Sequence, residues 1–328
     1  LFRLCRFYAL DRGRSARSRG RMIDLAVVVV TWNVREMALA AVDSLLADLD
    51  RSGLSSRLIV VDSASADGTV DALRSHFPSI DVIASDVNLG FVRANNLALR
   101  QLGFGQGQSV DQLPRATYLL NPDTLTHPGA TRSLFDALIS DARVGLVGAR
   151  LEYGDGAFQH SAFMFPGLSQ LWVEFFPTPG RLIEGRFNGR YPRHLYDGAA
   201  PFEVDFVLGA TMMLRREVIE RVGMFDEGFF MYCEEIDWAW RIRQAGWSVW
   251  CVPAARVTHY GGASSSQARP QTIRHLWESR LRLIDKHYPR WKAVLARRLI
   301  ALGMAHKMRS AAPESAAAYA HIRRLAAL

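Results

Sequence analysis

The chain of 328 residues has little cysteine and no long apolar run. Its three cysteines, Cys5, Cys233 and Cys251, are odd in number and lack metal-ligand spacing, which is typical of structural thiols in a reducing compartment. No uninterrupted apolar stretch reaches about 18 residues, so no segment is expected to span a bilayer. We therefore expect a cytoplasmic protein, associated at most peripherally with the inner face of the plasma membrane.

Two common nucleotide-binding signatures are also missing. No Gly-x-Gly-x-x-Gly motif opens the first predicted helix, and no Walker-type Gly-Lys-Ser/Thr occurs anywhere in the chain. The glycines of the first motif and the lysine of the second hold phosphates in their respective folds. Their absence disfavours dinucleotide oxidoreductases and P-loop enzymes.

Positive charge is concentrated in the first residues of the chain. The formal net charge is +8, and residues 1–21 contain seven arginines against one acid, Asp11. The rest of the chain carries only about +2, so charge gives little support for nucleic acid as a partner. We expect residues 1–21 to be a disordered basic leader, or upstream sequence read before a start at Met22. RNA or membrane binding by this segment is the alternative.

Apolar, β-branched runs that end abruptly in polar residues recur four times, at 25–33, 58–67, 80–88 and 118–123. Helical patterns accompany them, at 34–49, 69–77 and 89–102. Strands that alternate with helices predict an α/β protein with a parallel, doubly wound sheet. Ligands of such sheets bind at the carboxyl ends of the strands, so the polar residues there are candidates for a binding site.

The segment 116–124, ATYLLNPDT, is the clearest of these strand ends. Pro122 cannot continue a strand ladder, so Asp123 is predicted just past the carboxyl end of a buried strand. A carboxylate at that edge can hold a hard divalent cation against phosphate oxygens. The alternative is that Asp123 caps a helix from about Gly129 or closes a turn.

The second half of the chain is less regular. Residues 152–203 are rich in aromatic side chains, which suit sugar rings or acyl chains; packing of a β-rich subdomain explains them equally well. Apolar runs at 204–214 and 247–252 predict two further buried strands. Residues 271–304 combine Trp, Leu and Arg at helical spacing, which indicates a membrane-surface element, a dimer helix, or a packed helix with a solvated basic face.

Three carboxylates open one predicted helix. Glu234, Glu235 and Asp237 follow Cys233, and Gly246 ends the helix. The helix dipole stabilises acids at this end, and Asp237 can pair with Arg241 four residues later. Mutual repulsion within such a cluster also raises the pKa of one member, which suits a general base.

Several ordered motifs together resemble one family. They are VVVVTWN (27–33), VVDSASADGT (60–69), NLGFVRANNLAL (88–99), LLNPDT (119–124), the segment 209–247 that contains CEEIDWAWR, and VTHYGGAS (257–264). Over some four fifths of its length, the chain resembles the inverting family 2 glycosyltransferases, in particular the bacterial rhamnosyltransferase-like branch.

The resemblance implies a GT-A fold, with a Rossmann-like, mostly parallel sheet, flanking helices and a C-terminal helical extension. The implied organisation is a leader (1–21), a GT-A domain (22–270) and the extension (271–328). Within the GT-A domain, 22–124 would be the nucleotide-binding half and 125–270 the acceptor half.

The resemblance also implies roles for individual residues. Glu235 occupies the position of the catalytic base, one methylene longer than the usual Asp, and Glu234 or Asp237 would assist. Asp123 and His259 would hold Mg²⁺ or Mn²⁺, although a lone histidine is more often structural. The expected substrate-binding residues are Thr31, Trp32, Asn33, Asp62, Ser63, Gly90, Phe91, Arg93, Asn96, Asn121 and Arg241.

The implied activity is metal-dependent transfer, with inversion, of a glycosyl group from a nucleotide sugar to a hydroxyl of a glycan or lipid-linked acceptor in cell-surface polysaccharide synthesis. The implied partners are these substrates, a membrane surface contacted through 271–304, and a second copy in a homodimer, without nucleic acid. The alternatives are a catalytically silent nucleotide-sugar-binding paralogue or scaffold and, from the leader alone, a nucleic-acid-binding protein.

Overall fold

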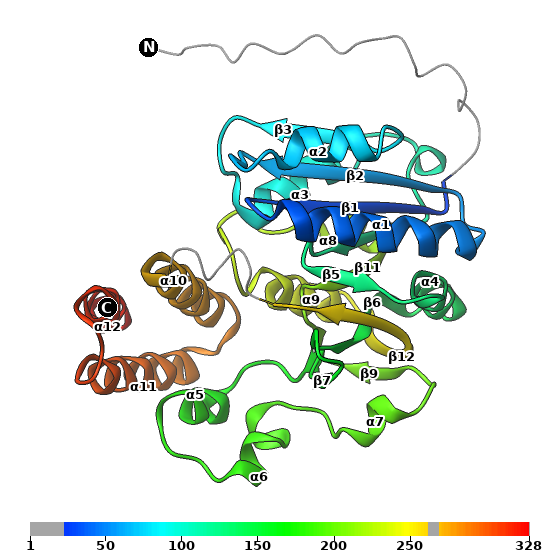
Figure 1. Cartoon of the computed structure of the whole chain (residues 1–328). Helices are drawn as coiled ribbons and strands as arrows, with labels where there is room; N and C mark the ends of the chain where they lie inside the picture. Colours follow the sequence, from blue (N-terminus) through cyan, green and yellow to red (C-terminus); the bar gives the residue numbers. More distant parts are fainter. Residues whose placement is uncertain (1–22, 262–268, 328) are drawn as a thin grey trace.

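The structure, a computed structural model, describes residues 23–261 and 269–327 (Figure 1). The expected basic leader, residues 1–21, lies outside the described residues. Among those described, no helix combines the length and apolar composition needed to cross a bilayer.

The central sheet begins with four parallel strands in the order β3-β2-β1-β4. These strands are β1 (Leu25–Thr31), β2 (Ser56–Ser63), β3 (Asp81–Ser85) and β4 (Ala116–Leu120). Val27 of β1 pairs with Leu58 of β2 on one side and with Tyr118 of β4 on the other. Strands β1, β2 and β4 are almost entirely buried, as strands of a parallel sheet with helices on both faces are, whereas the edge strand β3 is only partly buried.

The sheet continues beyond β4 in the order β11-β6-β12-β5. Strand β11 (Thr211–Arg215) runs antiparallel to both of its neighbours, β4 and β6 (Val144–Glu152). Strand β12 (Ser248–His259) is parallel to β6 and antiparallel to the edge strand β5 (Thr124–Thr126). The expected mostly parallel α/β sheet is therefore confirmed, with an antiparallel strand at its centre.

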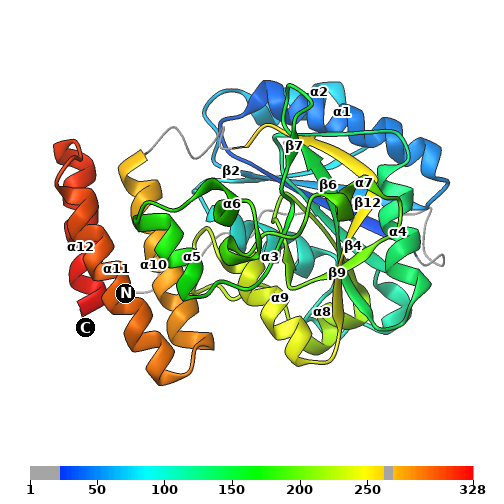
Figure 2. The same ribbon diagram turned by 90° about the horizontal axis from the view of Figure 1, so that it is seen from below.

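Helices cover both faces of the sheet (Figure 2). One face packs on α1 (Arg35–Ser52), α2 (Thr69–His76) and α4 (Ala130–Ser140). The other packs on α3 (Gly90–Gln101), α8 (Arg216–Val222) and α9 (Glu234–Gln244). Successive side chains of β1 point to opposite faces of the sheet, so Val27 and Val29 pack on the first face and Val28 on the second.

The region between β6 and β11 is built from short elements. They are β7 (Phe158–Gln159), β8 (Ala162–Phe163), α5 (Leu168–Phe175), α6 (Gly180–Ile183), α7 (His194–Asp197), β9 (Phe202–Val204) and β10 (Phe206–Val207). This region also contains the single 3₁₀ turn η2 (Arg186–Asn188); a second such turn, η1 (Val110–Gln112), precedes β4. Aromatic rings pack on one another here: Tyr196 is fully buried, 4.9 Å from Phe158 and 5.1 Å from Phe202 between ring centroids.

The single strand expected over 204–214 is instead three pieces: the end of β9, then β10, then β11. Strand β10 pairs with β8 in a separate small sheet, whereas β11 joins the central sheet. The chain crosses between the two sheets at residues 208–210. An apolar run therefore predicted the burial of this segment but not the change of sheet within it.

Three helices follow the sheet and stand together at one side of the molecule (Figures 1 and 2). They are α10 (Arg269–His287), α11 (Arg290–Met308) and α12 (Pro313–Ala327). Together with α5 they enclose a third apolar cluster that includes Phe175, Trp277 and Ile300. At Gly303 of α11 the helices approach so closely that a β-carbon would lie 2.2 Å from the Phe175 ring.

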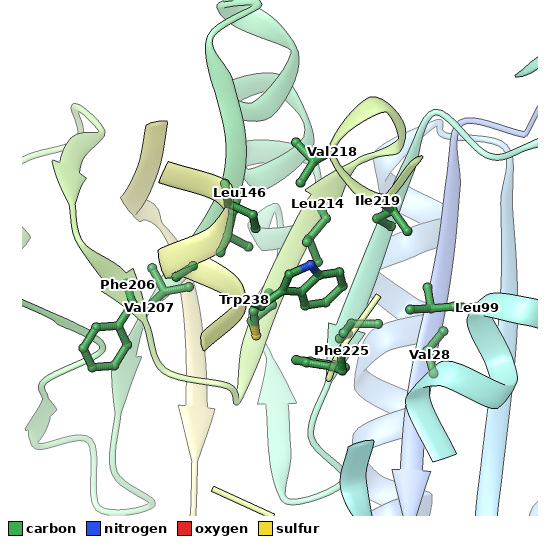
Figure 3. Close-up of a cluster of buried hydrophobic side chains, with 14 of the residues drawn as sticks. Val28, Leu99, Leu146, Phe206, Val207, Leu214, Val218, Ile219, Phe225 and Trp238 are labelled. Atoms are coloured by element: carbon green, nitrogen blue, oxygen red, sulfur yellow. The ribbon is translucent and has the colours of Figure 1, made fainter. Parts of the chain in front are cut away.

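Trp238 fixes helix α9 against the sheet (Figure 3). Its side chain is fully buried, its ring centroid lies 4.3 Å from that of Phe225, and its indole N–H donates to the carbonyl oxygen of Gly223 at 2.9 Å. Leu214 of β11 and Ile219 of α8 belong to the same cluster. The first turn of α9 is therefore held at the edge of the sheet by a packed core.

Replacing Trp238 with alanine should lower the free energy of unfolding by about 3–5 kcal/mol, because a large buried side chain is lost and a cavity remains. Denaturant unfolding monitored by circular dichroism measures this change. The matched control is Trp291→Ala, which removes a tryptophan that is 64% exposed and should change the free energy by no more than about 0.5 kcal/mol. Equal losses in both variants would contradict the packing described.

Candidate functional site

A cavity of about 410 Å³ opens at the carboxyl ends of the parallel strands. This volume lies within the range of about 300–1,000 Å³ that is usual for small-molecule sites. Its walls come from the strand ends, the start of α3, the loop and first turn of α9, and α10. The lining residues are Val30, Thr31, Trp32, Ser63, Asn88, Gly90, Phe91, Asn121, Pro122, Asp123, Leu208, Gly209, Ala210, Phe230, Met231, Tyr232, Glu234, Glu235, His259, Gln271, Thr272 and His275.

Asp123 and His259 meet on one wall of this cavity. Strands β5 and β12 pair with Thr124 opposite His259, and the backbone N–H of Tyr260 donates to the carbonyl oxygen of Asp123 at 3.0 Å. Both side chains are buried, with His259 Nε2 3.5 Å from Asp123 Oδ1. Two residues 136 positions apart in the chain are thus brought together by one strand pairing.

The donor set of this pair fits a divalent cation. Gln159 Oε1 lies 3.2 Å from His259 Nδ1 and accepts its hydrogen, which directs the lone pair of Nε2 toward Asp123. Asp123 Oδ1 is buried and has no hydrogen-bond partner. No group of three or more His, Cys, Asp or Glu among the described residues is arranged to hold a metal ion. Oxygen atoms of a substrate or water would therefore have to complete the coordination of a cation held here.

Glu234 and Glu235, at the start of α9, form another part of the cavity wall. Tyr232 and Cys233 precede them with φ angles of 69° and 64°, a left-handed conformation that is unusual for residues other than glycine. This bend starts α9 with both glutamates lining the cavity. One oxygen of each carboxylate, Oε2, is buried without a hydrogen-bond partner.

Burial determines the protonation of both glutamates. It raises the pKa of Glu235 to about 7. Burial, together with the nearby charge of Glu235, raises the pKa of Glu234 well above its ordinary value. Close to neutral pH, Glu235 is therefore the member of the pair that exchanges a proton most readily.

Asp237 and Arg241 do not line the cavity, although they were expected in the site. Asp237 Oδ2 accepts from Arg241 Nε at 2.9 Å, and Oδ1 lies 2.7 Å from both Lys286 Nζ and His287 Nε2 of α10. Burial on its own would raise the pKa of Asp237, but hydrogen bonds from His287 and Lys286 and the charge of Arg241 lower it. Asp237 thus ties α9 to α10 from behind the cavity.

Six of the expected substrate-binding residues line the cavity: Thr31, Trp32, Ser63, Gly90, Phe91 and Asn121. Asp62 and Asn33 lie outside the lining set. Asp62 is buried and accepts from the hydroxyls of Thr31 at 2.8 Å and Ser65 at 2.6 Å. Asn33 Oδ1 accepts from the backbone N–H of Ala66 at 2.8 Å. These two residues hold the loops after β1 and β2 in register.

Arg93 and Asn96 also lie away from the cavity. Asn96 binds both backbone groups of Phe225, with its Nδ2 donating to the carbonyl oxygen at 2.9 Å and its Oδ1 accepting from the N–H at 3.1 Å. Arg93 Nε lies 3.9 Å from Glu227 Oε2, and Glu227 belongs to the same loop as Phe225, between α8 and α9. The structure therefore places both residues where they fix the loop that leads to α9.

Helix α10 supplies lining residues that sequence reasoning missed. Gln271, Thr272 and His275 face the cavity, and the His275 ring lies 4.7 Å from that of Phe230, between centroids. Helical periodicity indicated a helix here but not which of its faces meets the sheet. By contrast, none of the aromatic residues of 152–203 lines this cavity.

Comparison with known proteins settles the family. Residues 26–223, more than half of the chain, match the profile of glycosyl transferase family 2. The chain belongs to this family. The glycosyltransferase is 29% identical over 245 residues to N-acetylglucosaminyl-diphospho-decaprenol L-rhamnosyltransferase of Mycobacterium tuberculosis, covering 73% of this chain and 78% of the relative. It is also 44% identical, over only 57 residues, to Rhamnosyltransferase WbbL of Escherichia coli, covering 17% of this chain and 22% of that protein.

Solved structures confirm the expected GT-A fold of this glycosyltransferase. GalNAc-T7 with UDP, GalNAc and Mn²⁺ superimposes with a TM-score of 0.56 at 13% identity, over 94% of this chain and 55% of that one. Mannosyltransferase PcManGT from Pyrobaculum calidifontis, in complex with GDP-Man and Mn²⁺, gives 0.52 at 16% identity, over 94% and 82%. The chain thus spans about half of the GalNAc-T7 chain.

Replacing Asp237 with asparagine should lower the free energy of unfolding by about 3–5 kcal/mol near neutral pH, because Arg241 and Lys286 lose a buried counter-charge. Because the pKa of Asp237 is lowered in the folded state, its contribution is complete above the unfolded value of about 3.9 and is lost as the pH falls through the folded value. Denaturant unfolding at several pH values tests both points.

The control for this variant is Asp285→Asn, which breaks an exposed ion pair with Arg297 and should cost no more than about 1 kcal/mol. Equal stability of the Asp237 variant and the unmodified protein at neutral pH would show that Asp237 does not anchor α10.

Proposed function

We propose that this glycosyltransferase moves a glycosyl group from a nucleoside diphosphate sugar to a hydroxyl of a lipid-linked glycan acceptor, in the synthesis of a cell-surface polysaccharide. One observation carries the proposal: Glu235 and the Asp123–His259 pair line the same cavity at the carboxyl edge of the sheet. The names of the Mycobacterium tuberculosis relative and the ligands in the two solved structures support the choice of substrates.

Glu235 is the proposed general base. Its unpartnered Oε2 accepts the proton of the acceptor hydroxyl as the hydroxyl oxygen attacks the anomeric carbon. The bond from that carbon to the diphosphate oxygen breaks in the same step, and the diphosphate leaves with the electron pair. Attack on the side opposite to the leaving group inverts the anomeric centre.

Glu234 is less suited to the role of base. Burial and the nearby charge of Glu235 raise its pKa well above the ordinary value, which favours the protonated form, a hydrogen-bond donor and not a proton acceptor. A protonated Glu234 also limits charge repulsion beside Glu235, which must be ionised to act as base.

The leaving diphosphate needs compensation for its negative charge. Asp123 and His259 would hold Mg²⁺ or Mn²⁺, which when bound supplies Lewis-acid stabilisation of the diphosphate. The orphaned Asp123 Oδ1 and the orientation of His259 Nε2 support this assignment. Thr31, Ser63 and Asn121, at the ends of neighbouring strands, would bind the nucleoside part of the donor.

Replacing Glu235 with glutamine should reduce transfer by about 10²- to 10⁴-fold and leave nucleotide affinity unchanged, because only proton acceptance is lost. The measurements are release of nucleoside diphosphate with a working acceptor and calorimetric titration of the nucleotide. Full transfer activity in this variant would refute the base assignment.

Two comparisons sharpen this test. In the unmodified enzyme, transfer should rise as the pH passes through about 7, because only ionised Glu235 accepts a proton; the Glu235→Gln variant should lack this step. A larger loss of transfer in Glu234→Gln than in Glu235→Gln would move the base to Glu234.

The alternative function has its own test. Nucleotide binding without any transfer in the unmodified protein would favour a catalytically silent paralogue.

Replacing Asp123 with asparagine should abolish the additional thermal stabilisation that Mn²⁺ gives in the presence of a nucleoside diphosphate. A ligand at 100 times its dissociation constant stabilises a protein by about 2.7 kcal/mol, so loss of the metal is measurable in a melting experiment. Uridine, guanosine and thymidine diphosphates should each be tried, with Asp111→Asn, an exposed site, as control. An undiminished Mn²⁺ effect in the Asp123 variant would exclude Asp123 as a ligand.

A further inference from the structure

We propose that one face of helix α11 binds the surface of an anionic lipid membrane. This α11 face consists of Trp291, Val294, Leu295, Arg298 and Leu302. The proposal goes beyond the proposed function and does not depend on which sugar or acceptor the enzyme uses.

The α11 face is apolar and exposed. Four large apolar side chains of this helix are exposed to solvent. The exposed fractions are 64% for Trp291, 48% for Val294, 45% for Leu295 and 65% for Leu302. Spacings of three, four and seven residues place these side chains on the same side of a helix. An exposed apolar stripe of this kind marks an interaction surface.

The opposite side of α11 fixes the direction of this face. Ala296, Ile300 and Met304 are fully buried in the cluster with α5 and α12, and Gly303 lies against the Phe175 ring. Rotation of the helix to bury Trp291 or Leu302 would expose these side chains. The α11 face therefore points away from the body of the protein as a fixed feature of the fold.

The charge around the face complements an anionic membrane. No acidic residue occurs between Asp285 and Glu314, whereas this stretch contains seven lysines and arginines. Some are engaged within the protein, such as Arg297 with Asp285 and Lys307 with Glu174. The remaining cations include Arg290, Arg298 and Arg309, none of which forms an ion pair among the described residues.

The composition of the face favours a lipid surface over a second copy of the chain. Arg298 lies in the middle of the apolar stripe, where a symmetric dimer would bring two arginines together without a counter-charge. At a membrane, an arginine can bury its aliphatic stem and keep its guanidinium among lipid phosphates. Tryptophan is likewise enriched at the level of lipid headgroups.

The position of α11 suits an enzyme whose acceptor is held in a membrane. Helix α10, which lines the cavity through Gln271 and His275, connects to α11 through Tyr288 and Pro289. Docking through α11 would therefore hold α10, whose first turns line the cavity, in a fixed position relative to the lipid surface. This consequence alone rests on the proposed lipid-linked acceptor.

The test is flotation of the full-length protein with vesicles made of equal parts phosphatidylcholine and phosphatidylglycerol, compared with vesicles of phosphatidylcholine alone. The protein should float with the anionic vesicles and much less with the neutral ones. Trp291→Ala combined with Leu302→Ala should weaken binding at least about tenfold, since two apolar side chains leave the interface. Arg298→Glu should weaken it by a similar factor, because an attraction becomes a repulsion.

Matched controls use exposed residues on other elements of the chain. Val110→Ala removes another exposed apolar side chain, and Arg51→Glu reverses a charge at the far end of α1 (Figures 1 and 2). Neither should change flotation by more than about twofold. Because residues 1–21 contain seven arginines that can bind anionic lipid themselves, the readout is the difference between variants that all retain them.

Three results would overturn the proposal. The first is absence of binding to anionic vesicles. The second is binding that the α11 variants do not weaken, which would place the lipid contact elsewhere in the chain. The third is a dimer in sedimentation experiments that Trp291→Ala with Leu302→Ala converts to a monomer, which would make the α11 face a protein interface.

Discussion

The placement of the first turn of α9 is the constraint on which the site depends. Trp238 packs this helix into the core, and Asp237 ties it to α10 through Arg241, Lys286 and His287. Neither contact uses the Glu235 side chain, which is partly buried and whose Oε2 atom lies buried without a hydrogen-bond partner. A packed core thus supports an unsatisfied carboxylate, which is an arrangement that costs stability and is usual at functional sites.

The sheet provides the opposing wall by a different principle. Parallel strands bring the residues that follow them to one edge, so Thr31, Ser63 and Asn121 share the cavity although they are far apart in the chain. The pairing of β5 with β12 then adds His259 beside Asp123. Family membership fits this geometry, because a glycosyltransferase needs both a place for a diphosphate and a base on the other side of the sugar.

Sequence reasoning recovered the parallel strands because apolar runs ending in polar residues are a local pattern, and it placed Asp123 correctly just past β4. It could not tell lining residues from their supports: Asp62 and Asn96 are polar and lie at plausible positions, yet their hydrogen bonds are to the protein itself. Nor could periodicity show that α10 meets the cavity, because that depends on packing between distant segments. The crossing at 208–210 was missed for the same reason.

The central claim is that three distant segments of the chain, carrying Asp123, His259 and Glu235, act on one ligand. Anomalous scattering from a crystal grown with Mn²⁺ and a nucleoside diphosphate tests it most directly. The account predicts a manganese peak bonded to Asp123 and His259 Nε2, with the diphosphate in the cavity that Glu235 lines. A nucleotide and metal bound elsewhere, with Asp123 and His259 free of both, would contradict it.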